Sequence, residues 1–179
     1  MECGEVLVVT GPPAAGKSAV ASLLVQELQF GVHLRADYFW DEFIRNDFLR
    51  PWMPESDQQN RTVVKAVAAA AVEYAKGGYA TVVDGIFGPW FAELIFPRFA
   101  AQGVACHYAV LLPVKEVTLK RSQSRTKTIT ESVLEKMHDE FSAHLEGYEK
   151  HVVDSTQLDV IRTAEVIREK LEAGQLIIR

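Results

Sequence analysis

Cysteine is scarce in this sequence. The two that occur, Cys3 and Cys106, stand far apart among 179 residues. Such a pair supports neither a disulfide framework nor a zinc site, because both need several suitably spaced cysteines. We therefore expect a protein of a reducing compartment and assign it to the cytoplasm.

Basic residues are outnumbered by acidic ones. The chain has 19 Lys and Arg against 24 Asp and Glu, which gives a formal net charge of −5. A protein dedicated to nucleic acid presents positive charge to the phosphates, so this balance argues against nucleic acid as a partner. A local basic cluster could still bind one small phosphate compound.

Long apolar runs are missing too. No stretch approaches the length of a membrane span. Glu2 and Glu5 stand where a secretory signal would have basic residues. The sequence therefore predicts neither membrane association nor secretion.

The remaining composition is that of a globular protein. Apolar residues make up 48% and charged residues 24% of the chain, which is enough apolar material for a full core. At roughly 100–200 residues per domain, the length predicts one domain over residues 1–179.

Short apolar segments alternate with segments of helical periodicity. We expect strands over residues 5–10, 32–36, 79–84, 104–112 and 151–154, with a further short strand over 176–178. We expect helices over residues 17–29, 38–48, 56–76, 89–102, 113–125, 131–150 and 159–171. This alternation is typical of an α/β fold with a mainly parallel sheet and helices on both faces.

The residues from Gly11 to Ser18 match the pattern G-x-x-x-x-G-K-[ST]. They follow a buried strand and open a helix, which is the context that a phosphate-binding loop requires. In such a loop the backbone N–H groups surround the phosphates, Lys17 adds a positive charge and the Ser18 hydroxyl binds Mg²⁺. The predicted ATP-binding residues here are Gly11, Pro13, Ala14, Ala15, Gly16, Lys17, Ser18 and Ala19.

With this loop the chain resembles the P-loop kinases of small molecules. The group includes gluconate kinases, shikimate kinases, chloramphenicol phosphotransferases and polynucleotide 5′-hydroxyl kinases. The matching features are the loop, Asp37, Val82-Val83-Asp84-Gly85, the segment 121–125 and His151-Val152-Val153-Asp154-Ser155. The resemblance implies a three-layer P-loop NTPase fold with five parallel strands. It also implies ATP and Mg²⁺ as cofactors, an acceptor region over about 37–60 and a short lid over about 121–135.

Asp37 follows one predicted strand and Asp84 ends another, at the edge where parallel sheets bind ligands. By resemblance, Asp37 is a catalytic residue that contacts substrate and orients the acceptor hydroxyl, with Asp41 as a weaker substitute. Asp37 could instead cap the next helix. Asp84 could contact Mg²⁺ or substrate, or cap the following loop.

One window of the chain is basic. Residues 115–127 contain five basic residues and one acidic residue, and Arg121 and Arg125 lie four apart on one helix face. By resemblance, Arg121 lies against the adenine and Arg125 is a catalytic residue that reaches the transferring phosphate. A solvated helix face is the alternative.

The segment after Asp37 is rich in aromatic residues. Trp40, Ile44 and Phe48 would share a helix face, which suits either the core or a pocket. We predict Trp40 and Arg45 as substrate contacts. His138, His144 and His151 lack the spacing of a metal pair, and a solvated helix face explains them better.

These features predict an ATP- and Mg²⁺-dependent phosphotransferase that acts on a hydroxyl of a small molecule, as a monomer or homodimer. Two alternatives stay open: a nucleoside or nucleotide kinase, and a P-loop ATP-binding protein without kinase activity.

Overall fold

The computed structural model describes residues 1–123 and 129–178. Its centre is a five-stranded parallel sheet with the strand order β2-β3-β1-β4-β5. The strands are β1 (Val6–Thr10), β2 (Gly31–Arg35), β3 (Ala80–Asp84), β4 (Cys106–Leu111) and β5 (Val152–Val153). The predicted α/β class with a parallel sheet and helices on both faces is confirmed.

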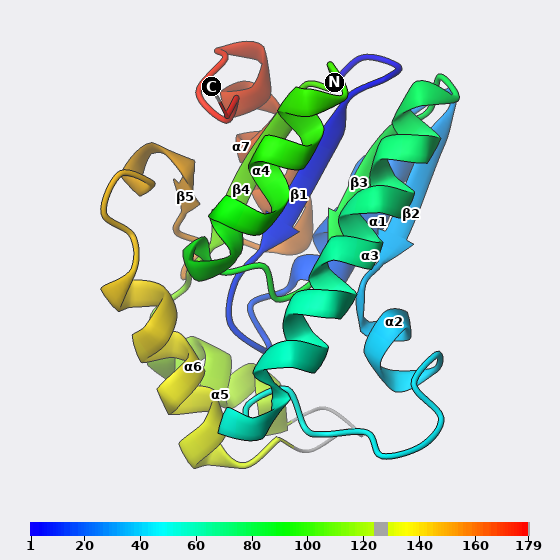
Figure 1. The fold of residues 1–179 in the computed structure, drawn as a ribbon. Coiled ribbons are helices and arrows are strands. Elements are labelled where there is room, and N and C mark those ends of the chain that lie inside the picture. Colours follow the sequence, from blue (N-terminus) through cyan, green and yellow to red (C-terminus); the bar gives the residue numbers. More distant parts are fainter. Residues whose placement is uncertain (124–128, 179) are drawn as a thin grey trace.

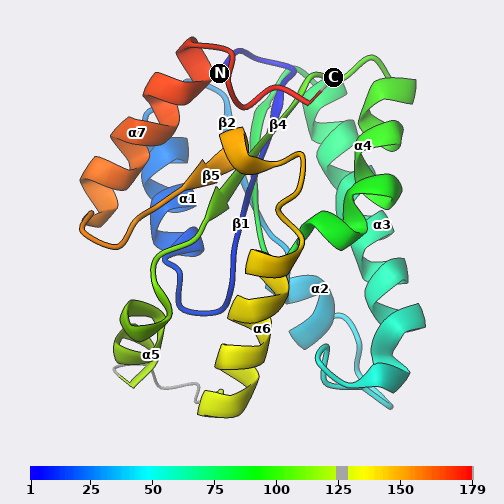
Figure 2. The same cartoon turned by 90° about the vertical axis from the view of Figure 1, so that its left-hand side faces the viewer.

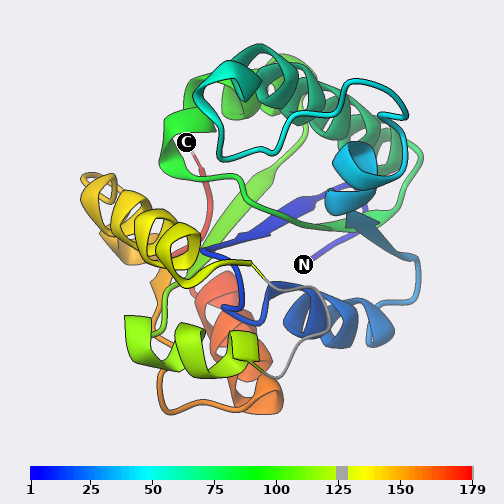
Figure 3. The ribbon, with the colours of Figure 1, turned by 90° about the horizontal axis from the view of Figure 1, so that it is seen from below.

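Helices cover both faces of the sheet. Along the chain they are α1 (Lys17–Gln26), α2 (Asp37–Asp41), α3 (Asp57–Lys76), α4 (Ala92–Ala101), α5 (Lys115–Gln123), α6 (Glu131–Ala143) and α7 (Val160–Glu172). Three short 3₁₀ turns occupy Pro54–Ser56, Pro89–Phe91 and Glu149–His151. Figure 3 shows α1 and α7 on one side of the sheet and α3 and α4 on the other.

Alternation along β1 separates two cores. Val6 and Val8 pack with the α3 and α4 side, whereas Leu7 and Val9 pack with the α1 and α7 side. Because β1 is central and buried on both faces, it is apolar at every one of these positions. The loop that connects β1 to α1 therefore starts from the centre of the sheet.

The carboxyl ends of the strands meet at one edge of the sheet. In Figure 1 this is the lower edge, and both chain termini lie at the upper end. Figure 2 shows α5 and α6 at the same lower edge. No helix within the described ranges is long and apolar enough to cross a membrane.

Two expected helices are much shorter than predicted. The helix expected over 38–48 ends at Asp41, and Asp47 further along has φ of 52°, outside the right-handed helical region. Leu49 is hydrogen bonded through both its backbone groups to the Gln59 side chain. The helix expected over 131–150 ends at Ala143, and Gly147 then adopts a left-handed conformation with φ of 81°.

The short strand expected over 176–178 forms only a single bridge. Residues 176–178 return beside β4, where His107 and Ile177 form an isolated antiparallel bridge. Two backbone hydrogen bonds flank this bridge, from Tyr108 N to the Leu176 carbonyl and from Ile178 N to the Cys106 carbonyl, each 2.9 Å. Cys106 itself is buried in β4.

Candidate active site

Two glycines with positive φ shape the loop between β1 and α1. Gly11 has φ of 144°, and a Cβ there would stand 2.2 Å from the Leu111 carbonyl oxygen of β4. Gly16 has φ of 101° and is the N-cap of α1. The loop therefore packs tightly against β4 and leaves the first N–H groups of α1 available to an anion.

Lys17 reaches back across this loop. Its Nζ donates to the carbonyl oxygens of Gly11, at 3.0 Å, and Pro12, at 2.9 Å. The ammonium is thus held over the loop, where it can attract the β- and γ-phosphate oxygens of a bound nucleotide.

Asp84, the last residue of β3, lies directly beside α1. The Ser18 hydroxyl donates a short hydrogen bond to Asp84 Oδ2. The other carboxylate oxygen, Oδ1, accepts from His33 Nε2 of β2 at 2.8 Å. Side chains from β2, β3 and α1 therefore meet at the buried carboxylate of Asp84.

Two opposing effects act on the Asp84 carboxyl. Burial raises its pKa, but the hydrogen bonds from His33 and Ser18, aided by the charges of His33 and Lys17, lower it further than burial raises it. Asp84 is therefore ionised at neutral pH even though only 2% of the residue is exposed.

Ser18 Oγ and Asp84 Oδ2 are the hard oxygen donors that Mg²⁺ prefers, and their direct contact fits a shared ion. Among the described residues, no group of three or more His, Cys, Asp or Glu could hold a metal. Ser18 and Asp84 could therefore supply only part of a coordination shell, in which Mg²⁺ would take its other ligands from water and nucleotide phosphates.

Asp37 begins α2 at the end of β2. Ala36 occupies the N-cap position and no side chain caps this helix, so the capping alternative for Asp37 is wrong. The carboxyl keeps access to solvent. Nevertheless, crowding by protein atoms raises its pKa, the carboxylates of Asp84 and Asp41 act in the same direction, and Lys17 opposes them.

Arg121 joins the loop after β1 to the segment after β5. Its guanidinium donates to the carbonyl oxygens of Ala15 at 3.4 Å, Ser155 at 3.2 Å and Leu158 at 3.4 Å. The side chain is thus anchored beside the phosphate-binding loop. Arg125, the second predicted arginine, lies outside the described residues.

The two predicted substrate contacts after α2 lie in different environments. Trp40 is 7% exposed, and its Nε1 donates to Asn60 Oδ1 at 2.9 Å. Its ring lies 6.5 Å from that of Phe87, within the core. Arg45 is exposed in the segment after α2. Their roles as substrate contacts stay predictions.

Two histidines contradict the expectation of a solvated face. His138 is buried with Nε2 2.8 Å from the Pro113 carbonyl oxygen, and His151 is buried with Nδ1 3.0 Å from the Tyr108 carbonyl oxygen. Each imidazole satisfies a backbone group in the interior, which explains its burial. His144 is exposed, as expected.

His33 is the site residue that sequence reasoning missed. It stands in the middle of the strand Gly31–Arg35, where an apolar residue is usual. The available signal in the sequence was a polar side chain inside a short strand. Without the pairing of β2 with β3, nothing in the sequence joins His33 to Asp84.

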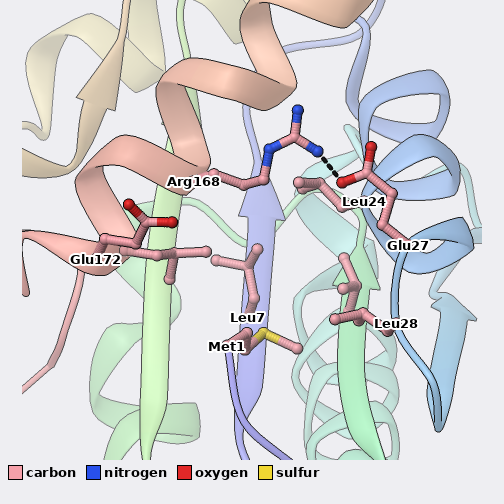
Figure 4. A pocket seen from close by; sticks show the side chains of 9 residues that line it. Met1, Leu7, Leu24, Glu27, Leu28, Arg168 and Glu172 are labelled. Carbon is pink, nitrogen blue, oxygen red and sulfur yellow. Dashed lines mark hydrogen bonds and ion pairs between the residues drawn. The ribbon is translucent and has the colours of Figure 1, made fainter.

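One cavity lies away from this site. It has a volume of about 190 Å³ and lies between α1 and α7, with Leu7, Leu24 and Leu28 among its apolar lining residues. An ion pair between Arg168 and Glu27 borders it (Figure 4). Leu28 follows the C-terminal end of α1, so the cavity lies at the opposite end of this helix from Lys17 and Ser18.

Comparison with known proteins agrees with this architecture. A family model described as "AAA domain" matches residues 6–144. No curated protein sequence matches the chain.

Solved structures with the same fold are distant in sequence. A sugar kinase from Janibacter sp. HTCC2649 superposes with a TM-score of 0.72 at 18% identity, covering 94% of each chain. The tunicamycin resistance protein of Deinococcus radiodurans gives 0.68 at 14% identity, covering 98% of each. A chain of the Pnkp1/Rnl/Hen1 RNA repair complex gives 0.66 at 17% identity over 83% of this chain, which spans only 47% of that one.

Proposed function

Because the chain belongs to the AAA domain family, we propose that it is a P-loop phosphotransferase that moves the γ-phosphate of ATP to a hydroxyl of a small molecule. The expected resemblance to P-loop kinases agrees with this membership. The proposal covers residues 1–179 as one domain, with an acceptor region over about 37–60 and a lid over about 121–135.

The observation that best supports transfer is that Lys17, held over the loop after β1, shares one edge of the sheet with the carboxylates of Asp37 and Asp84. These charged groups come from the ends of β2 and β3 and from the start of α1. Phosphoryl transfer depends mainly on positioning and charge stabilisation, so a carboxylate beside the phosphate-binding lysine suits an acceptor-orienting role.

Each group would then have a distinct task. The loop N–H groups and Lys17 bind the nucleotide phosphates, Ser18 and Asp84 hold Mg²⁺, and Asp37 accepts a hydrogen bond from the acceptor hydroxyl. Mg²⁺ held there would supply charge neutralisation on the nucleotide phosphates. The raised pKa of Asp37 makes its carboxylate a better proton acceptor than an ordinary one.

The segment after α2 supports a small molecule as acceptor. Gln59 bonds both backbone groups of Leu49, at 3.0 and 2.8 Å, and Asn60 donates to the Pro51 carbonyl oxygen at 2.7 Å. This segment is therefore anchored to α3 although it has no regular structure. It still leaves Phe43 65% exposed and Trp52 37% exposed, which gives an acceptor apolar surface to contact.

A screen of hydroxyl compounds for stimulated ADP release tests the proposal. Sugars, antibiotics and nucleosides should be included, with a 5′-hydroxyl oligonucleotide as a separate arm. One class should stimulate ADP release in the unaltered chain, and Lys17→Ala and Asp37→Asn should lose the stimulation. ADP release that no hydroxyl compound changes would contradict transfer and favour nucleotide binding or hydrolysis alone.

A further inference from the structure

His33 contacts the carboxylate that also accepts from the loop serine. Its Nε2 lies 2.8 Å from Asp84 Oδ1, and the side chains of His33 and Asp84 are 18% and 3% exposed. The residue paired with Asp84 across the two strands is Arg35, so His33 stands two positions earlier on the same face of β2. The imidazole therefore points forward along the sheet, toward the edge where the phosphate-binding loop lies.

Each oxygen of the Asp84 carboxylate has its own hydrogen-bond partner. An ionised carboxylate only accepts hydrogen bonds, so His33 donates to Oδ1 while Ser18 donates to Oδ2. With both oxygens bonded, the carboxylate plane is held against rotation. If His33 were absent, the contact with Ser18 alone would leave the plane less constrained.

The burial of this pair strengthens the argument. Burying a carboxylate costs folding free energy unless its oxygens are hydrogen bonded. His33 of β2 supplies the second hydrogen bond to Asp84. Groups that hold a metal-binding carboxylate in this way commonly change metal affinity by about 10–100-fold when they are removed.

We propose that His33 is a positioning residue for the metal ligand Asp84, so that it sets Mg²⁺ affinity without touching nucleotide or acceptor. This inference rests on the proposed use of Mg·ATP but not on any identified acceptor. It follows from the juxtaposition of His33, Asp84 and Ser18 across β2, β3 and α1.

Binding measurements without an acceptor test the role. ATP affinity is measured by calorimetry with excess EDTA and then over a Mg²⁺ titration, in the unaltered chain and in His33→Leu. His33→Leu should require about 10–100-fold more Mg²⁺ for the same enhancement of ATP binding. Its ATP affinity in EDTA should stay within about twofold, since the loop is intact.

Two further variants separate positioning from folding. His33→Gln can place an amide N–H where Nε2 lies and should recover most of the Mg²⁺ affinity. His33→Asn is too short to do so and should behave like His33→Leu. This pair keeps the test decisive if the leucine variant does not fold.

His151→Leu is the matched control. It removes a buried imidazole that bonds the Tyr108 carbonyl oxygen instead of a site residue. It should lower the melting temperature while leaving the Mg²⁺ requirement unchanged.

A double-mutant cycle with Asp84→Asn tests whether His33 acts through Asp84. In that background, His33→Leu should have little further effect on Mg²⁺ affinity. A full further loss there, or an Mg²⁺ affinity within about twofold in His33→Leu, would overturn the positioning role. Absence of ATP binding by the unaltered chain would overturn the proposed function as well, so the two failures are distinguishable.

Discussion

The two loop glycines differ in what an added methyl group would meet. At Gly11, with φ of 144°, the Cβ would lie 2.2 Å from the Leu111 carbonyl oxygen. At Gly16, with φ of 101°, nothing lies within 4 Å. The pair therefore separates backbone strain from a steric clash with β4.

The expected costs follow from this geometry. A non-glycine residue in such backbone regions costs about 1–3 kcal/mol of folding free energy, and Gly16→Ala should lose that amount. Gly11→Ala bears the same strain, and its Cβ is also more than 1 Å inside ordinary contact with backbone that cannot swing away. Overpacking of this kind adds about 1–3 kcal/mol or more. Gly11→Ala should therefore lose about 2–6 kcal/mol, a large share of a typical total of about 5–15 kcal/mol.

Urea unfolding followed by circular dichroism measures both losses. Gly103→Ala serves as a control away from the loop, because Gly103 has φ of 67° and open space around its Cβ position. It should resemble Gly16→Ala. Equal losses of unfolding free energy in Gly11→Ala and Gly16→Ala would refute the close packing of the loop against β4.

Three further substitutions have defined outcomes. Asp37→Asn should abolish transfer yet stabilise the fold at pH 7, because a carboxyl with a raised pKa destabilises the folded state once it ionises. That gain should disappear at pH values below the unfolded pKa, and a melting temperature at pH 7 below that of the unaltered chain would contradict it. Arg121→Lys keeps the charge but loses the guanidinium group that bonds the carbonyl oxygens of Ala15, Ser155 and Leu158. ATP affinity measured by calorimetry should therefore fall by about tenfold. An unchanged ATP affinity would exclude a nucleotide-binding role for Arg121. Gln59→Ala frees both backbone groups of Leu49 and should cost about 1–3 kcal/mol, with faster limited proteolysis between residues 42 and 53; an unchanged cleavage rate would show that the segment is held otherwise.

Much of the fold could be predicted from local patterns. The continuous apolar run of β1 indicated a central strand, and the alternation of strands and helices indicated a parallel sheet. The loop motif located the start of α1, since its two glycines and its lysine lie within one short stretch of the chain. Such features depend on backbone preferences within a few residues.

Site residues at strand ends were predictable for the same reason. Asp37 follows β2 and Asp84 ends β3, and in a parallel sheet the carboxyl ends of strands share one edge. The assignment of roles to them still depends on which groups surround each carboxyl.

What the sequence alone determined is therefore the set of elements, their parallel arrangement and the phosphate-binding loop. The tertiary structure decided that His33 bonds Asp84 from 51 residues away and that Gln59 holds the segment after α2. It also placed His138 and His151 in the interior. These outcomes follow from strand register and side-chain packing between distant segments, where free energy of burial and hydrogen bonding overrides local preference.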